Sequence, residues 1–169
     1  MQLIIDGHNL IPHVQGIRLS DIDDEAQLTD RLVNYCRVKR CKVFVFFDQA
    51  PVGFSGVRSY GAVTAHFVPQ GQTADDAIIR YLKQLKGTAK NYRVVSSDRK
   101  VMAAARDVHA QVITSVDFAK EMVDTSEEAP DIDPRSRLLS DEEISDWEAL
   151  FQDGKKSKIT DKSDKNKKR

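Results

Sequence analysis

The chain has 169 residues, 40% hydrophobic and 31% charged, with 26 basic and 26 acidic side chains; this composition excludes a fibrous or wholly disordered protein, and the length excludes two large domains. Cys36 and Cys41 are too few for a disulfide framework, and their spacing suits neither a CxxC redox pair nor a four-ligand zinc site. No apolar run is long enough for a signal peptide or a membrane span, so we expect a cytoplasmic protein without a membrane partner.

The first half of the chain shows strands alternating with one helix. Apolar, β-branched runs predict buried strands, and apolar positions at helical spacing, with acids first and bases last, predict a helix. In order, these segments are a strand at 2–5, a helix at 23–40, a strand at 42–47 and a strand at 62–68. A glycine-bearing loop, 49–61, precedes the last strand, and the pattern within it favours a helix only weakly.

The second half continues this alternation. Thr73 suits the N-cap of a helix that Gly87 would close as its C′ glycine. There follow a strand at 92–96, a helix at 100–107, a strand at 112–114 and a short helix capped by Ser115. Such alternation implies right-handed crossovers, so we predict a three-layer α/β fold with a mostly parallel sheet of about five strands over residues 1–124.

The remainder of the chain differs in charge. The net charge is +2 over residues 1–125, −8 over 126–153 and +6 over 154–169. Residues 125–139 are predicted to form an acidic linker. Residues 154–169 are predicted to form a disordered lysine-rich tail, which would either attract polyanions or merely keep the protein in solution. Between them, 140–153 begin with a capping box and carry an apolar stripe that includes Trp147. This amphipathic helix would pack on its own domain or on a partner.

Five aspartates fall where they can meet. Asp6, Asp48 and Asp98 follow predicted strands, and Asp75 and Asp76 open the helix after another strand. The carboxyl ends of parallel strands share one edge of the sheet, which is where ligands bind in such folds. Gathered carboxylates repel one another, and a hard cation such as Mg²⁺ or Mn²⁺ would offset that repulsion. The alternative is that each acid serves only locally, as a helix cap, a first-turn acid or a turn former.

Other polar side chains could assist at this edge. Asn9 could orient a metal-bound water or donate to a phosphate oxygen, and Ser97 could act in the same way beside the last acid. His8 is a candidate phosphate contact, although a lone histidine is more often structural. Arg58 and Tyr60 offer a phosphate contact and a stacking face of the kind that single-stranded RNA uses, or are solvated loop residues.

Three strings carry a resemblance to a known family. Residues 4–11 read IIDGHNLI, 73–76 read TADD and 94–98 read VVSSD. In this order and separation they resemble the YacP-like branch of the NYN-domain family, within the PIN-like nuclease superfamily. The resemblance covers roughly residues 1–124 and implies a PIN-like fold and a metal-dependent endoribonuclease.

The resemblance also implies roles for individual residues. The motif acids, which would bind Mg²⁺ or Mn²⁺, and the motif asparagine correspond to Asp6, Asp75, Asp98 and Asn9, with Asp76 and Asp48 as further candidate ligands. The family includes a ribosome-associated enzyme that cleaves messenger RNA, which makes messenger RNA the expected substrate and the ribosome a candidate partner. The alternative function is a catalytically silent module that binds RNA or the ribosome. An aspartyl-phosphate phosphatase is disfavoured, because Asp6-Gly-His lacks the second acid that such an enzyme uses.

Overall fold

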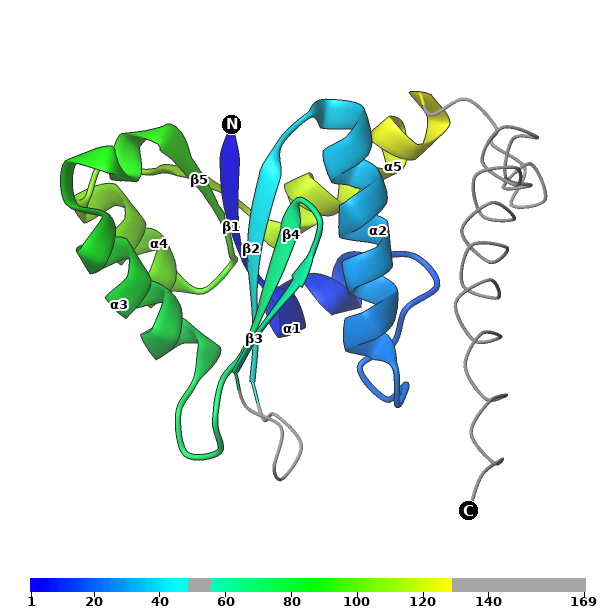
Figure 1. The fold of residues 1–169 in the computed structure, drawn as a ribbon, viewed down its shortest axis with the longest axis horizontal. Helices are drawn as coiled ribbons and strands as arrows, with labels where there is room; N and C mark the ends of the chain where they lie inside the picture. Colours follow the sequence, from blue (N-terminus) through cyan, green and yellow to red (C-terminus); the bar gives the residue numbers. More distant parts are fainter. Residues whose placement is uncertain (49–55, 129–169) are drawn as a thin grey trace, which may run out of the picture. The chain divides into compact units, whose positions relative to one another are not determined.

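The computed structural model describes residues 1–48 and 56–128. The predicted tail, the Trp147 helix, most of the acidic linker and part of the glycine-bearing loop lie outside the described residues. Over the described ranges, helices cover both faces of one six-stranded sheet (Figure 1). The predicted three-layer α/β fold is therefore confirmed.

The strand order of the sheet is β3-β4-β2-β1-β5-β6. The strands are β1 (Gln2–Asp6), β2 (Lys42–Phe47), β3 (Gly56–Tyr60), β4 (Val63–Phe67), β5 (Tyr92–Val95) and β6 (Gln111–Ile113). All neighbouring pairs are parallel except β3 with β4. From β1 the chain builds outward through β2 and β4, then crosses to β5 and β6 on the other side. The strand order thus reverses beside β1, which is the point where open α/β sheets bind ligands.

Alternating side chains of the strands build two apolar cores. The helices are α1 (Gly7–Leu10), α2 (Asp24–Lys39), α3 (Ala74–Leu85), α4 (Arg99–Asp107) and α5 (Ser115–Glu128), with 3-10 turns at Ile11–His13 and Lys86–Asn91. Leu3 and Ile5 pack with α1, α2 and α5, whereas Ile4 packs with α3 and α4. These two sets of helices lie on opposite faces of the sheet (Figure 1). No helix within the described ranges is long and apolar enough to cross a membrane.

The edge strand β3 corrects one prediction. Residues 56–60 form an antiparallel hairpin with β4, so they contain no helix, and Arg58 and Tyr60 lie on a strand rather than in a loop. Every residue of β3 is exposed, so it lacks the alternation of apolar and polar side chains that marks a half-buried strand. Pairing with β4 alone makes it a strand, and the sheet has six strands rather than about five.

Two helix ends also differ from expectation. Helix α3 ends at Leu85 with Lys86 as its C-cap, so Gly87 holds the predicted C′ position, but the positive φ of 46° falls on Lys86 rather than on this glycine. Helix α5 has 14 residues and ends at Glu128, beyond the predicted domain limit of 124 and inside the predicted acidic linker. It continues because Met122 and Thr125 extend its buried face, which the acidic composition of this stretch conceals.

Candidate active site

Asp6 occupies the centre of the carboxyl edge of the sheet. It ends β1 and caps α1, with its Oδ1 accepting the Asn9 N–H at 3.2 Å. Helix α1 lies so close to β2 that a Cβ on Gly7 would clash with the fully buried ring of Phe47. Glycine at position 7 therefore permits the close packing of α1 on β2, directly after Asp6, which is only 5% exposed.

Burial is the main influence on the Asp6 carboxyl. It raises the pKa of Asp6 to about 7; the Asn9 N–H opposes this shift, and the carboxylates of Asp75 and Asp48 add to it. A carboxyl group in this state is only partly ionised near neutral pH. A nearby positive charge would lower its pKa and favour the ionised form.

Asp75 links the other acids electrostatically. Burial raises its pKa, a hydrogen bond with Asp6 lowers it, and the carboxylates of Asp98, Asp48 and Asp76 raise it again. Asp75 thus lies within electrostatic reach of the four other predicted acids. We call Asp6, Asp48, Asp75, Asp76 and Asp98 the acid cluster. The sheet and the start of α3 bring together the residues that the sequence placed at strand and helix ends.

Two further members of the cluster, Asp98 and Asp48, accept N–H groups at helix starts, as Asp6 does. Asp98 Oδ1 accepts the N–H groups of Lys100 and Val101 at 2.8 and 3.1 Å, at the start of α4. Asp48 accepts the N–H of Ala74, at the start of α3. The local role considered for Asp98 is therefore real. Because both N–H groups of α4 bind Oδ1, capping leaves Oδ2 of that carboxylate to other partners, so capping and metal binding are compatible.

The amide of Asn9 joins three segments of the chain. Its Oδ1 accepts the Ser97 N–H at 2.9 Å and the Ser115 hydroxyl at 2.6 Å. Ser97 Oγ in turn accepts the Ser115 N–H at 3.1 Å. Asn9 and Ser97 thus tie α1 to the loop that carries Asp98 and to the start of α5.

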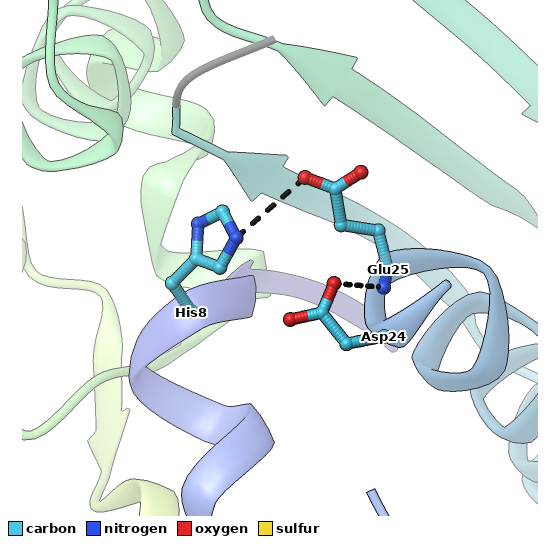
Figure 2. A group of neighbouring side chains, drawn as sticks. All are labelled: His8, Asp24 and Glu25. Atoms are coloured by element: carbon cyan, nitrogen blue, oxygen red, sulfur yellow. Dashed lines mark hydrogen bonds and ion pairs between the residues drawn. The ribbon is translucent and has the colours of Figure 1, made fainter. Parts of the chain in front are cut away.

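His8 belongs to a second group, with Asp24 and Glu25 (Figure 2). Its Nδ1 accepts the Asp48 N–H at 3.1 Å, and its Nε2 lies 3.6 Å from Glu25 Oε1. Asp24 Oδ1 accepts the Glu25 N–H at 2.7 Å. Histidine, cysteine, aspartate and glutamate side chains can each offer a ligand atom to a metal ion. Within the described part of the chain, His8, Asp24 and Glu25 are the one set of three whose ligand atoms lie within 4.8 Å of one another.

This second group fits a cation poorly. An Nδ1 that accepts a hydrogen bond leaves the proton of a neutral imidazole on Nε2, so no lone pair faces Glu25. A metal-binding histidine instead donates from its second nitrogen. Sequence reasoning did not identify Asp24 and Glu25 as neighbours of His8, because only the packing of α2 against α1 brings them together.

Comparison with known proteins then places the chain in a family. The sequence model of the YacP-like NYN domain matches residues 3–163. The chain belongs to the YacP-like NYN family. The match extends well beyond residue 124, where the resemblance was expected to end, so the C-terminal segment belongs to the family's sequence pattern too. No curated protein matches the sequence.

Two solved structures share the fold of this YacP-like chain. The crystal structure of Rae1 (YacP) from Bacillus subtilis is 21% identical, with a TM-score of 0.63, covering 93% of this chain and 91% of that one. A mutant of the same protein, in which leucine replaces a tryptophan, is 20% identical, with a TM-score of 0.61, covering 76% and 77%. At this identity the likeness supports the fold, and the family match supports a nuclease-type function.

One predicted substrate contact lies away from the acids of this NYN domain. Arg58 pairs with Ala65 in the middle of the β3–β4 hairpin, and β4 and β2 separate its strand from β1. Ser97, in contrast, is exposed and directly precedes Asp98. The structure thus brings Ser97, Asn9 and His8 to the acid cluster and leaves Arg58 on the edge strand.

Proposed function

We propose that the protein is a metal-dependent endoribonuclease that hydrolyses RNA phosphodiester bonds. The observation that carries this proposal is the acid cluster: Asp75 lies within electrostatic reach of four other aspartates beside β1, where the strand order reverses, in a chain of the YacP-like NYN family. The pKa values of Asp6 and Asp75 are raised first by burial and then by the neighbouring carboxylates, and a divalent cation would offset both effects by favouring the ionised forms.

The donor set fits Mg²⁺ or Mn²⁺, because every candidate ligand is a carboxylate oxygen. Asp6, Asp75 and Asp98 would hold the ion, with Asp48 and Asp76 as further ligands. Once bound, the ion supplies an activated water and neutralises charge on the scissile phosphate. The chain contributes ionised carboxylates in fixed positions, and Asn9 holds the loop of Asp98 in place.

The expected products follow from attack by water. Hydrolysis of the P–O3′ bond leaves the phosphate on the 5′ side of one fragment and a free 3′-hydroxyl on the other. Ser97 is the proposed phosphate contact, because it is exposed beside Asp98. Messenger RNA is the proposed substrate and the ribosome a proposed partner, on the family resemblance of the motif strings.

The decisive experiment is cleavage of a mixed pool of single-stranded and structured RNA with Mn²⁺, Mg²⁺ or EDTA. We expect cleavage by the wild type only with a divalent ion, and none by Asp6→Asn. Asp107→Asn, which removes an exposed acid from the far end of α4, is the matched control and should cleave as the wild type does. Products with a 2′,3′-cyclic phosphate would contradict the mechanism, since they arise from attack by the RNA's own 2′-hydroxyl.

A second arm separates the enzyme from the binding module. If purified RNA is not cleaved, the same proteins are tested with translating ribosomes. Cleavage there would identify the ribosome as the context that presents the substrate. The silent binding module would be established instead if the wild type and Asp6→Asn both bind RNA or ribosomes and the wild type cleaves in neither assay.

A further inference from the structure

A line of contacts runs from α2 to the acid cluster. Glu25, in the first turn of α2, faces His8 on α1; His8 meets the backbone of Asp48 at the end of β2; and Asp48 meets the N–H of Ala74, next to Asp75 on α3. We call the first three residues the Glu25–His8–Asp48 chain. It joins three elements that are distant in sequence to one member of the acid cluster.

The imidazole of His8 is fixed from three sides. Its Nδ1 accepts the Asp48 N–H, its Nε2 faces the Glu25 carboxylate, and its ring lies edge-on to Phe47, with centroids 5.8 Å apart at 72°. Glu25 favours a proton on Nε2, and that tautomer leaves Nδ1 free to accept. Glu25, which faces His8 in Figure 2, therefore favours the tautomer of His8 whose Nδ1 accepts the Asp48 N–H.

Asp48 is consequently held by both its backbone and its side chain. Its N–H is bound to His8, and its carboxylate accepts the N–H of Ala74. Because Asp75 directly follows Ala74, this second bond also sets where the Asp75 carboxylate lies relative to Asp6. Neither Glu25 nor the imidazole of His8 needs to contact RNA or an ion to have this effect.

We propose that Glu25 and His8 are positioning residues that hold Asp48, and through it the first turn of α3 with Asp75, in the arrangement of the acid cluster. The effect on catalysis rests on the proposed function, whereas the effect on the backbone does not. His8 thereby acts through Asp48 rather than as a phosphate contact. Partners that orient metal ligands in this way commonly change metal affinity or activity by about 10- to 100-fold.

Amide hydrogen exchange, measured by NMR without metal or RNA, tests the chain of contacts directly. Glu25→Ala should speed exchange of the Asp48 and Ala74 amides about tenfold, and Glu25→Gln should keep exchange slow, since its amide oxygen can face Nε2 as the Glu25 carboxylate does. Asp30→Ala, which removes an exposed acid from the same helix, should change neither. The amide of Val45 in β2 is the control for global stability, and its exchange rate should stay the same in all variants. A general loss of stability would speed exchange at Val45 as well.

The activity arm uses the concentration of Mn²⁺ needed for half-maximal cleavage. Glu25→Ala should raise it about tenfold while the KM for RNA stays unchanged, and His8→Ala should raise it at least as much. Unchanged exchange at Asp48 and Ala74 in both variants would overturn the positioning role. A wild type that does not cleave RNA would instead refute the proposed nuclease, and the exchange data would still decide the role of Glu25 and His8.

Discussion

At the scale of single residues, burial sets the chemistry of Asp6. The side chain is 5% exposed and has two carboxylate neighbours, and its pKa of about 7 reflects first the loss of water and then the neighbouring charge. Asn9 lies beside it and uses one amide oxygen to accept two hydrogen bonds. Asp6 therefore supplies charge, and Asn9 holds the surrounding loops in place.

Asp6 should make the stability of the metal-free protein depend on pH. Its pKa is about 7 in the native state and 3.8 in a model peptide, so the folded protein binds this proton more tightly. The stabilisation is full below about pH 4 and is lost as the pH rises through about 7. In EDTA, the free energy of unfolding should fall by roughly 4 kcal/mol over this window, and Asp6→Asn should lack that fall. Urea titrations at several pH values measure the free energy of unfolding of the wild type and of Asp6→Asn. The same dependence on pH in both proteins would contradict the raised pKa of Asp6.

Loss of the Asn9 side chain should destabilise the fold. Asn9→Ala leaves the fully buried Ser115 hydroxyl without its acceptor, which costs about 1–3 kcal/mol. Ser115→Ala should cost less, because Asn9 keeps the Ser97 N–H. Urea unfolding of both single variants and the double variant measures the coupling, and costs that simply add would show that the two side chains do not interact.

At the scale of elements, helix starts converge on the acid cluster. Asp6, Asp98 and the Thr73 hydroxyl each cap a helix, and Asp48 accepts a further N–H at the start of α3. Capping fixes each acid relative to its own helix, while packing fixes the helices relative to the sheet. The acids are therefore held by elements rather than by flexible loops, as a reactive site requires.

Variants of Asp98 should separate capping from charge. Asparagine caps a helix about as well as aspartate, so Asp98→Asn should unfold like the wild type, whereas Asp98→Ala should lose about 1 kcal/mol. Both should lose metal-dependent cleavage. Thermal unfolding and the cleavage assay together test this, and full activity in Asp98→Asn would leave this residue with the helix-cap role alone.

The packing of α1 on β2 should tolerate no side chain at position 7. In Gly7→Ala the new Cβ meets the ring of Phe47, which is fully buried and cannot move aside, so we expect a loss of about 1–3 kcal/mol. Gly87→Ala is the matched control, since a Cβ there meets nothing within 4 Å. Thermal unfolding compares the two; equal midpoints would show that α1 can shift away from β2.

At the scale of the whole molecule, the strand order decides where charge collects. Helices on opposite faces cover the strands on either side of β1, and both halves of the sheet present their carboxyl ends to the same edge. The charge that results is costly without a counter-ion. The same architecture that builds the fold thus gathers the negative charge that we propose a cation offsets.

Divalent ions should raise the stability of the folded protein, because only the native state assembles the acid cluster. An ion at 100 times its Kd adds about 2.7 kcal/mol to the free energy of unfolding. We expect Mn²⁺ or Mg²⁺ to raise the midpoint of thermal unfolding of the wild type, and NaCl of equal ionic strength not to do so. The same shift in Asp75→Asn would show that the ions bind elsewhere.

The amino-acid sequence by itself determined the local features of this protein. Apolar runs gave most of the strands, the spacing of α2 and α3 marked them as helices, and Thr73 was identified as an N-cap. The acids were found because they sit at the ends of elements, and the ends of parallel strands share an edge. These inferences succeed because each depends on neighbours in the sequence or on a general rule of sheet geometry.

Only the tertiary structure decided the features that depend on distant residues. The exposed strand β3 forms because β4 pairs with it, and α5 continues because its far end is buried. Asn9 meets Ser97 and Ser115 across 88 and 106 positions of sequence, and Glu25 meets His8 only through the packing of two helices. Such contacts are set by how helices pack across the sheet, which the local sequence pattern does not encode.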